Sequence, residues 1–104
     1  MDEHKVDFAA LDWQSPGPGV RQKVYEGPGR LLRLVEFSRE FREPDWCRKG
    51  HLGYVVEGDL EIDFAGTKVS YGPGDGICIP AGEAHRHKAA ALSRTVRLIL
   101  VEEA

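Results

Sequence analysis

Two histidines, His85 and His87, follow a Pro-Gly turn in the last quarter of the chain. Residues 74–85 read G-x5-P-x-G-x2-H, a pattern typical of a β-strand, a tight turn and a histidine that starts the next strand. Alternate residues of a strand share one face, so if His85 points into a barrel, His87 does too. Imidazole is a common metal ligand and a general base near neutral pH. The stretch therefore indicates a chemically active site inside a barrel.

The rest of the chain reads as short strands separated by glycine and proline. We expect strands over residues 20–26, 31–37, 51–56, 60–64, 69–71, 77–79 and 94–102. No segment has the pattern of a normal helix, and Pro44 would break any helix begun just before it. Residues 57–59 read Glu-Gly-Asp, which favours a hairpin at Gly58. Strands spaced about 8–12 residues apart predict an all-β sandwich or barrel.

At 104 residues the chain is expected to form a single domain. Within it we assign residues 1–29 to an N-terminal arm and first strand, and residues 30–104 to the barrel. A domain this small buries a limited share of its surface, so apolar contact with a partner subunit would stabilise it. We therefore expect a homodimer whose N-terminal strands cover the partner's sheet edge.

The composition argues against a membrane span, a secretion signal and a nucleic-acid partner. No apolar run approaches the length of about 18–20 residues that spans a bilayer. The charged N-terminus lacks the apolar stretch of a secretion signal, which favours the cytoplasm. In that compartment Cys47 and Cys78 are expected as thiols, with a disulfide between them as the less favoured alternative. The net charge is −3 and the basic residues are scattered, so no nucleic-acid surface is indicated.

Three segments of the chain together resemble a known family. These are residues 53–60, residues 72–75 and residues 79–85, which resemble motifs of the cupin superfamily, in particular its small single-domain members. The likeness extends over about residues 30–101. The second cupin motif, G-x5-P-x-G-x2-H-x3-N, is met through His85, and Ala89 stands where the family has asparagine. The resemblance implies a cupin-type jelly-roll barrel, that is, an antiparallel double-stranded β-helix.

The first cupin motif, H-x-H-x3-4-E-x6-G, is altered here. Counting back from Gly58 places His51 at the glutamate position, and places Cys47 and Asp45 at the two histidine positions. A second register would start the histidine pair at His51, but Phe64 then stands where the family has glycine, so we prefer the first.

The resemblance implies a metal bound by Asp45, Cys47, His51 and His85, since each replacement is itself a metal-binding residue type. A thiolate with imidazoles suits Zn²⁺, and the same set accepts Fe, Ni or Mn. We expect His87 nearby as a catalytic base, a further ligand or a partner of a ligand. The alternatives are ordinary ones: Asp45 as a turn residue, Cys47 as a buried thiol, and the histidines as packed side chains.

Two classes of function fit this set. The resemblance implies a metal-dependent enzyme, a dioxygenase or an isomerase, acting on a small organic molecule. The alternative is a non-enzymatic module that senses oxidants through Cys47 and zinc, or that binds a small molecule. A fold alone does not choose between them, because this barrel carries many unrelated functions.

Overall fold

The computed structural model describes residues 4–103 and is built from strands. In chain order the elements are η1 (Phe8–Ala10), β1 (Gln14–Gly17), β2 (Val20–Gly27), β3 (Arg30–Ser38), β4 (His51–Glu57), β5 (Leu60–Asp63), β6 (Lys68–Tyr71), β7 (Gly76–Ile79), η2 (Glu83–His85), β8 (Lys88–Ala91) and β9 (Thr95–Glu103). The two η elements are single 3-10 turns, and no longer helix occurs among these residues. No helix here has the length and hydropathy required to cross a membrane.

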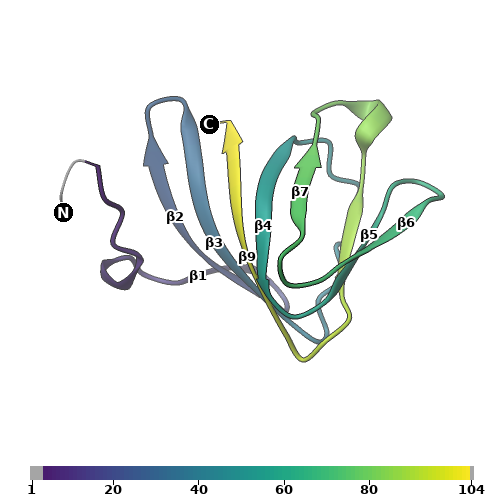
Figure 1. Ribbon diagram of the computed structural model, residues 1–104, viewed down its shortest axis with the longest axis horizontal. Coiled ribbons are helices and arrows are strands. Elements are labelled where there is room, and N and C mark those ends of the chain that lie inside the picture. Colours follow the sequence, from purple (N-terminus) through teal and green to yellow (C-terminus); the bar gives the residue numbers. More distant parts are fainter. Residues whose placement is uncertain (1–3, 104) are drawn as a thin grey trace.

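The strands form two antiparallel sheets that face each other (Figure 1). One sheet has six strands in the order β1-β2-β3-β9-β4-β7, and the other has three in the order β6-β5-β8. The sheets come together at one end of the molecule and separate toward the other, as Figure 1 shows. This is the expected all-β jelly-roll architecture of the cupin type, and that prediction is confirmed.

Period-two alternation along the strands creates the core between the sheets. On β9, Val96, Leu98 and Leu100 are buried while the residues between them are more exposed. On β5, Leu60 and Ile62 are buried in the same way and face them from the smaller sheet. Such an alternation is what one buried sheet face requires. The interior between the two sheets is therefore apolar.

Gly58 takes the chain from one sheet to the other, which differs from the expected hairpin. The strands on either side of it, β4 and β5, lie in different sheets and do not pair. Gly58 has a φ of +82°, and a Cβ at this position would lie 2.0 Å from the carbonyl oxygen of Thr95. Glycine is needed here for both reasons, because the backbone is left-handed and β9 passes very close.

One strand was not expected from the sequence, and another begins later than expected. β1 contains Pro16, a residue that normally indicates a loop, and it lies at a sheet edge where proline is tolerated. The strand expected to start at His85 is β8, which begins only at Lys88 because a 3-10 turn occupies Glu83–His85. β2 pairs along its whole length with β3. The proposed division into residues 1–29 and 30–104 stays a prediction. Its first three residues and its last residue lie outside the described residues 4–103.

Candidate metal centre

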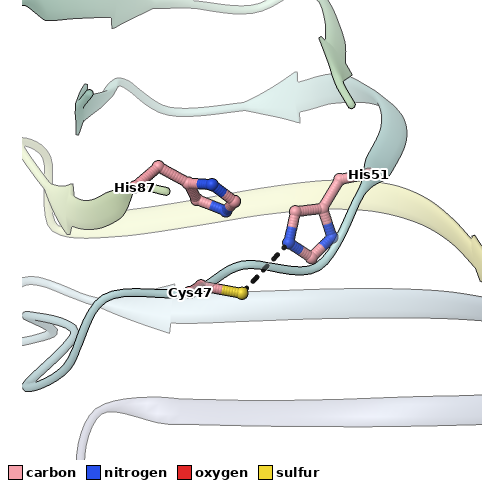
Figure 2. A group of neighbouring side chains, drawn as sticks. All are labelled: Cys47, His51 and His87. Carbon is pink, nitrogen blue, oxygen red and sulfur yellow. Dashed lines mark hydrogen bonds between the residues drawn. The ribbon is translucent and has the colours of Figure 1, made fainter. Parts of the chain in front are cut away.

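Three potential metal ligands, Cys47, His51 and His87, converge between the sheets (Figure 2). One donor atom from each lies within 4.8 Å of the others. Cys47 belongs to the irregular segment before β4, His51 begins β4, and His87 immediately precedes β8. Figure 2 shows the three side chains directed toward one another.

The backbone fixes two of these residues against each other. The N–H of Cys47 donates to the carbonyl of His87 at 2.8 Å, and the N–H of His87 donates to the carbonyl of Cys47 at 2.9 Å. This reciprocal pair is an isolated antiparallel bridge. It holds the loop that carries Cys47 onto the start of the small sheet, so the thiol and the imidazole leave neighbouring backbone positions on the same side.

The ring nitrogens are arranged so that each histidine keeps one available for a ligand. Nε2 of His51 lies 3.6 Å from Sγ of Cys47. Nδ1 of His87 lies 3.0 Å from the carbonyl oxygen of His85, which makes Nδ1 the donor and leaves Nε2 as an acceptor. Orientation of a ligating imidazole by its other nitrogen is the usual arrangement around a protein-bound metal.

A buried carboxylate, Glu102 on β9, stands behind His51. Its Oε2 lies 2.5 Å from Nδ1 of His51 and 3.0 Å from Nη1 of Arg33. The contact with His51 is an ion-pair contact without hydrogen-bond alignment, so this buried Nδ1 lacks an aligned partner among the described residues. Arg33 is held in turn, since its Nε donates to Oε1 of Gln22 at 2.8 Å. A chain of polar contacts thus crosses the inner face of the large sheet from β2 to the Cys47 thiol.

Burial and the neighbouring groups shift two pKa values at the site. Burial acts most strongly on Glu102 and would raise its pKa, but the contact with His51 and the charge of Arg33 together lower it below the ordinary value. Burial raises the pKa of the Cys47 thiol, and the N–H of Lys49, which donates to the sulfur, opposes this without cancelling it. Glu102 is therefore an anion at neutral pH, and Cys47 is a thiol until a cation favours the thiolate.

His85 and Asp45 lie outside this group, in contrast to the ligand set implied by resemblance. His85 is exposed, because Glu83–His85 forms a 3-10 turn after Gly82, whose φ is +123°. Strand alternation therefore does not hold between residues 85 and 87, and only His87, which is 3% exposed, faces the interior. Asp45 is also exposed, in the bend that precedes Cys47. The ligand roles themselves stay predictions.

Glu102 and Arg33 were missed by sequence reasoning, although the sequence contains a signal for them. On β9 the inward positions run Val96, Leu98, Leu100 and then Glu102, which places a carboxylate on an apolar face. Arg33 likewise interrupts the inward positions of β3. A charged residue in register with buried aliphatic ones rarely lies there without a partner.

The donor set fits a transition metal. A tetrahedral zinc with Zn–S of about 2.3 Å and Zn–N of about 2.0–2.1 Å holds its sulfur and nitrogen donors about 3.6 Å apart. The distance of 3.6 Å between Sγ of Cys47 and Nε2 of His51 matches that edge. Three protein donors leave a fourth position for a small molecule, which is the pattern of catalytic rather than structural sites.

A cavity of about 1070 Å³ opens beside the three donors. Aliphatic side chains of both sheets line it, among them Val24, Leu31, Leu60 and Leu100. Its size is that of pockets for small organic ligands, which are mostly apolar with a few polar groups. The donor group therefore faces a chamber large enough for a substrate.

The class of protein that this barrel and its internal histidines define is that of the cupins. Residues 46–102 match the family model described as "Cupin domain". This match spans more than half of the chain, and the protein belongs to the cupin family. A comparison with curated proteins found no match.

Similar solved structures extend over nearly the whole chain. KdgF from Halomonas sp. is 28% identical, with a TM-score of 0.74, and the match covers 89% of this chain and 88% of that one. An RmlC-like cupin from Shewanella frigidimarina is 18% identical, with a TM-score of 0.78 and coverage of 97% and 90%. A sugar phosphate isomerase of the cupin superfamily from Silicibacter pomeroyi is 16% identical, with a TM-score of 0.79 and coverage of 96% and 75%. The last two likenesses concern the fold alone.

Proposed function

We propose that this protein is a metal-binding cupin that takes a small organic molecule into its barrel. Cys47, His51 and His87 would hold a divalent transition metal such as Zn, Fe, Ni or Mn. The observation that carries the proposal is the convergence of three donor atoms within 4.8 Å beside a large cavity. When bound, such an ion polarises a carbonyl or activates a coordinated molecule.

An enzymatic role, as a dioxygenase or an isomerase, is the form of this function that we favour. The apolar walls of the cavity would bind the carbon skeleton of a substrate and exclude water from the donor group. Glu102 would keep Nδ1 of His51 protonated and so present Nε2 to the metal. We assign His87 to the ligands rather than to proton transfer, since its Nδ1 is already engaged by the carbonyl of His85.

Metal analysis of the purified protein tests the proposal and also separates the two histidines. We expect about one transition-metal ion per chain after growth with Zn, Fe, Ni and Mn supplied. His87→Ala should lose it, while the matched variant His85→Ala should retain it. Metal-free wild-type protein would refute the proposed function, and loss of metal in His85→Ala alone would favour the ligand set expected from resemblance.

A second candidate function is oxidant sensing through Cys47. The observation that favours it is a half-buried free thiol 3.6 Å from a ring nitrogen, where oxidation would remove a ligand. Zinc-loaded protein treated with hydrogen peroxide should then release zinc, measured with a chromophoric chelator. Cys78→Ser, which alters the exposed cysteine, should release zinc as the wild type does. Retention of zinc by the oxidised wild-type protein would exclude sensing.

We also propose that the protein forms homodimers in the cytoplasm, as expected from its sequence. Strand β1 lies at the edge of the large sheet, and Leu52 and Tyr54 are 57% and 53% exposed on the outer side of β4. A partner subunit would cover both features. Light scattering after size exclusion should give twice the chain mass, and Leu52→Glu should lower it while Val69→Glu on β6 should not. A monomeric mass for the wild type at all concentrations would refute the dimer.

A further inference from the structure

The cavity beside the donor group contains cationic side chains that the metal proposal does not use. Arg33, Arg42 and Lys49 all line it. Nη1 of Arg42 donates to the backbone carbonyls of Arg39, Phe41 and Ala91, so this guanidinium is committed to the fold. Lys49 and Arg33, in contrast, have hydrogen-bond donors that no described residue engages.

Lys49 is the clearest case. Within residues 4–103 its ammonium group forms no hydrogen bond and no ion pair. The charge nevertheless lies close to the donor group, since it lowers the pKa of both Cys47 and Glu102. Lys49 is an exposed residue in the lining of the cavity and near the donor group, so its ammonium is placed to meet a ligand that enters the cavity.

Arg33, on β3 of the large sheet, presents a second donor. Its Nε and Nη1 are engaged by Gln22 and Glu102, whereas its Nη2 makes no contact with a hydrogen-bond acceptor in the described part of the chain. The first two bonds fix the guanidinium plane, and its side chain is only 19% exposed. A planar donor held in this way is well suited to an oxygen anion, because little entropy is lost on binding.

The carboxylates of the cavity do not satisfy these donors. Oε2 of Glu102 contacts both His51 and Arg33. Oε1 of Glu43 accepts the N–H of Ala89 at 2.9 Å, which ties this side chain to β8. Glu26 and Glu40 line the cavity but are exposed residues, as expected at its mouth. None of the four forms an ion pair with Lys49.

We propose that the cavity binds a small organic carboxylate, whose apolar body lies against the aliphatic walls and whose carboxylate contacts Lys49 and Arg33. This deepens the proposed function by naming a class of ligand for the same site, and it rests on that function for the role of the ligand as substrate. The binding itself depends on the charges of Lys49 and Arg33 and on the apolar lining.

Paired probes of equal shape test the charge requirement. Benzoate and cyclohexanecarboxylate are titrated against benzamide and cyclohexanecarboxamide by calorimetry, with both zinc-loaded and chelator-treated protein. At least one carboxylate should bind at least tenfold more tightly than its amide in the chelator-treated protein. Equal affinities for carboxylate and amide, or no binding of either carboxylate, would overturn the proposal.

Variants then assign the contact to residues. Lys49→Gln should weaken carboxylate binding at least fivefold, while Lys68→Gln, which removes an exposed lysine on β6 outside the cavity, should leave it unchanged. Arg33→Lys retains the charge but loses the fixed plane, and should weaken binding with little loss of folded protein by circular dichroism. Equal affinities of Lys49→Gln and Lys68→Gln would overturn the proposal.

The outcomes separate this inference from the proposed function. Carboxylate binding that depends on Lys49, in a protein that takes up no transition metal when Zn, Fe, Ni and Mn are supplied, would support the inference and refute the metal site. One metal ion per chain with no preference for carboxylates over amides would support the proposed metal site and refute carboxylate binding.

Discussion

Replacing Glu102 with glutamine removes the buried charge behind His51 and preserves the shape of the side chain. Oε2 of Glu102 contacts His51 at 2.5 Å and Arg33 at 3.0 Å, and the side chain is 6% exposed. Hydrogen bonds to charged groups contribute about 1.5–3 kcal/mol each. Only the contact with Arg33 is an aligned hydrogen bond, and glutamine can still accept from Arg33 through its amide oxygen, so the free energy of unfolding should fall by no more than about 1.5–3 kcal/mol.

The same substitution should weaken zinc binding, because the partner that orients His51 is lost. Loss of such a partner typically reduces metal affinity about 10–100-fold, which corresponds to about 1.4–2.7 kcal/mol. Zinc affinity is measured by competition with a chromophoric chelator, and folding by urea denaturation of metal-free protein. Glu103→Gln is the matched control, since residue 103 is the exposed neighbour on the opposite face of β9. If Glu102→Gln and Glu103→Gln bind zinc within threefold of each other, Glu102 does not position His51.

Three further outcomes follow from the packing and the charges. Gly58→Ala should lower the free energy of unfolding by about 1–2 kcal/mol because of its backbone conformation, and by a further amount of about 1–3 kcal/mol because the new Cβ is overpacked against Thr95. Gly66→Ala is the control: its φ is +121° but the space around it is open, so it should lose only the contribution of the backbone conformation. Leu60→Ala, at a residue 1% exposed, should cost about 2–5 kcal/mol in urea denaturation, and a loss below 1 kcal/mol would contradict the described core. The folded-state pKa of Glu102 lies below its ordinary value of about 4.3, so its contribution to stability is present above that value and is lost as the pH falls through the folded-state pKa. Metal-free wild-type protein should therefore lose more stability than Glu102→Gln between pH 7 and pH 3 by urea titration, and parallel curves would count against the ion pair.

The fold could be predicted from the sequence because its signals are local. Strands bounded by glycine and proline, and the motif ending at His85, led to the jelly roll, and the described strands and the family match confirm it. The prediction of a hairpin at Gly58 was wrong, because the residues of a turn do not determine the sheet to which the next strand belongs. That choice depends on the position of β9, which lies far away along the chain.

The site was only partly accessible to the same reasoning. Cys47 and His51 converge as expected from the spacing of the altered first motif, whereas His87, and not His85, lies beside them. The 3-10 turn at Glu83–His85 delays the start of strand alternation until after His85, and no residue type in that turn predicts a 3-10 turn there. The alternation along β9 marks Glu102 as an inward carboxylate, but its contact with His51 depends on the pairing of β9 with β4, which the sequence does not specify.

The reciprocal bridge between Cys47 and His87 is made entirely by main-chain atoms. Neither of its two bonds depends on the side chain at position 47, so a substitution there changes the donor element while the segment that presents it stays in place. Replacing Cys47 with histidine or aspartate would exchange the sulfur donor of the proposed site for imidazole nitrogen or carboxylate oxygen, and would shift its preference from soft toward harder ions. The metal preference of the proposed site therefore depends on one side chain, whereas the backbone that presents this side chain does not.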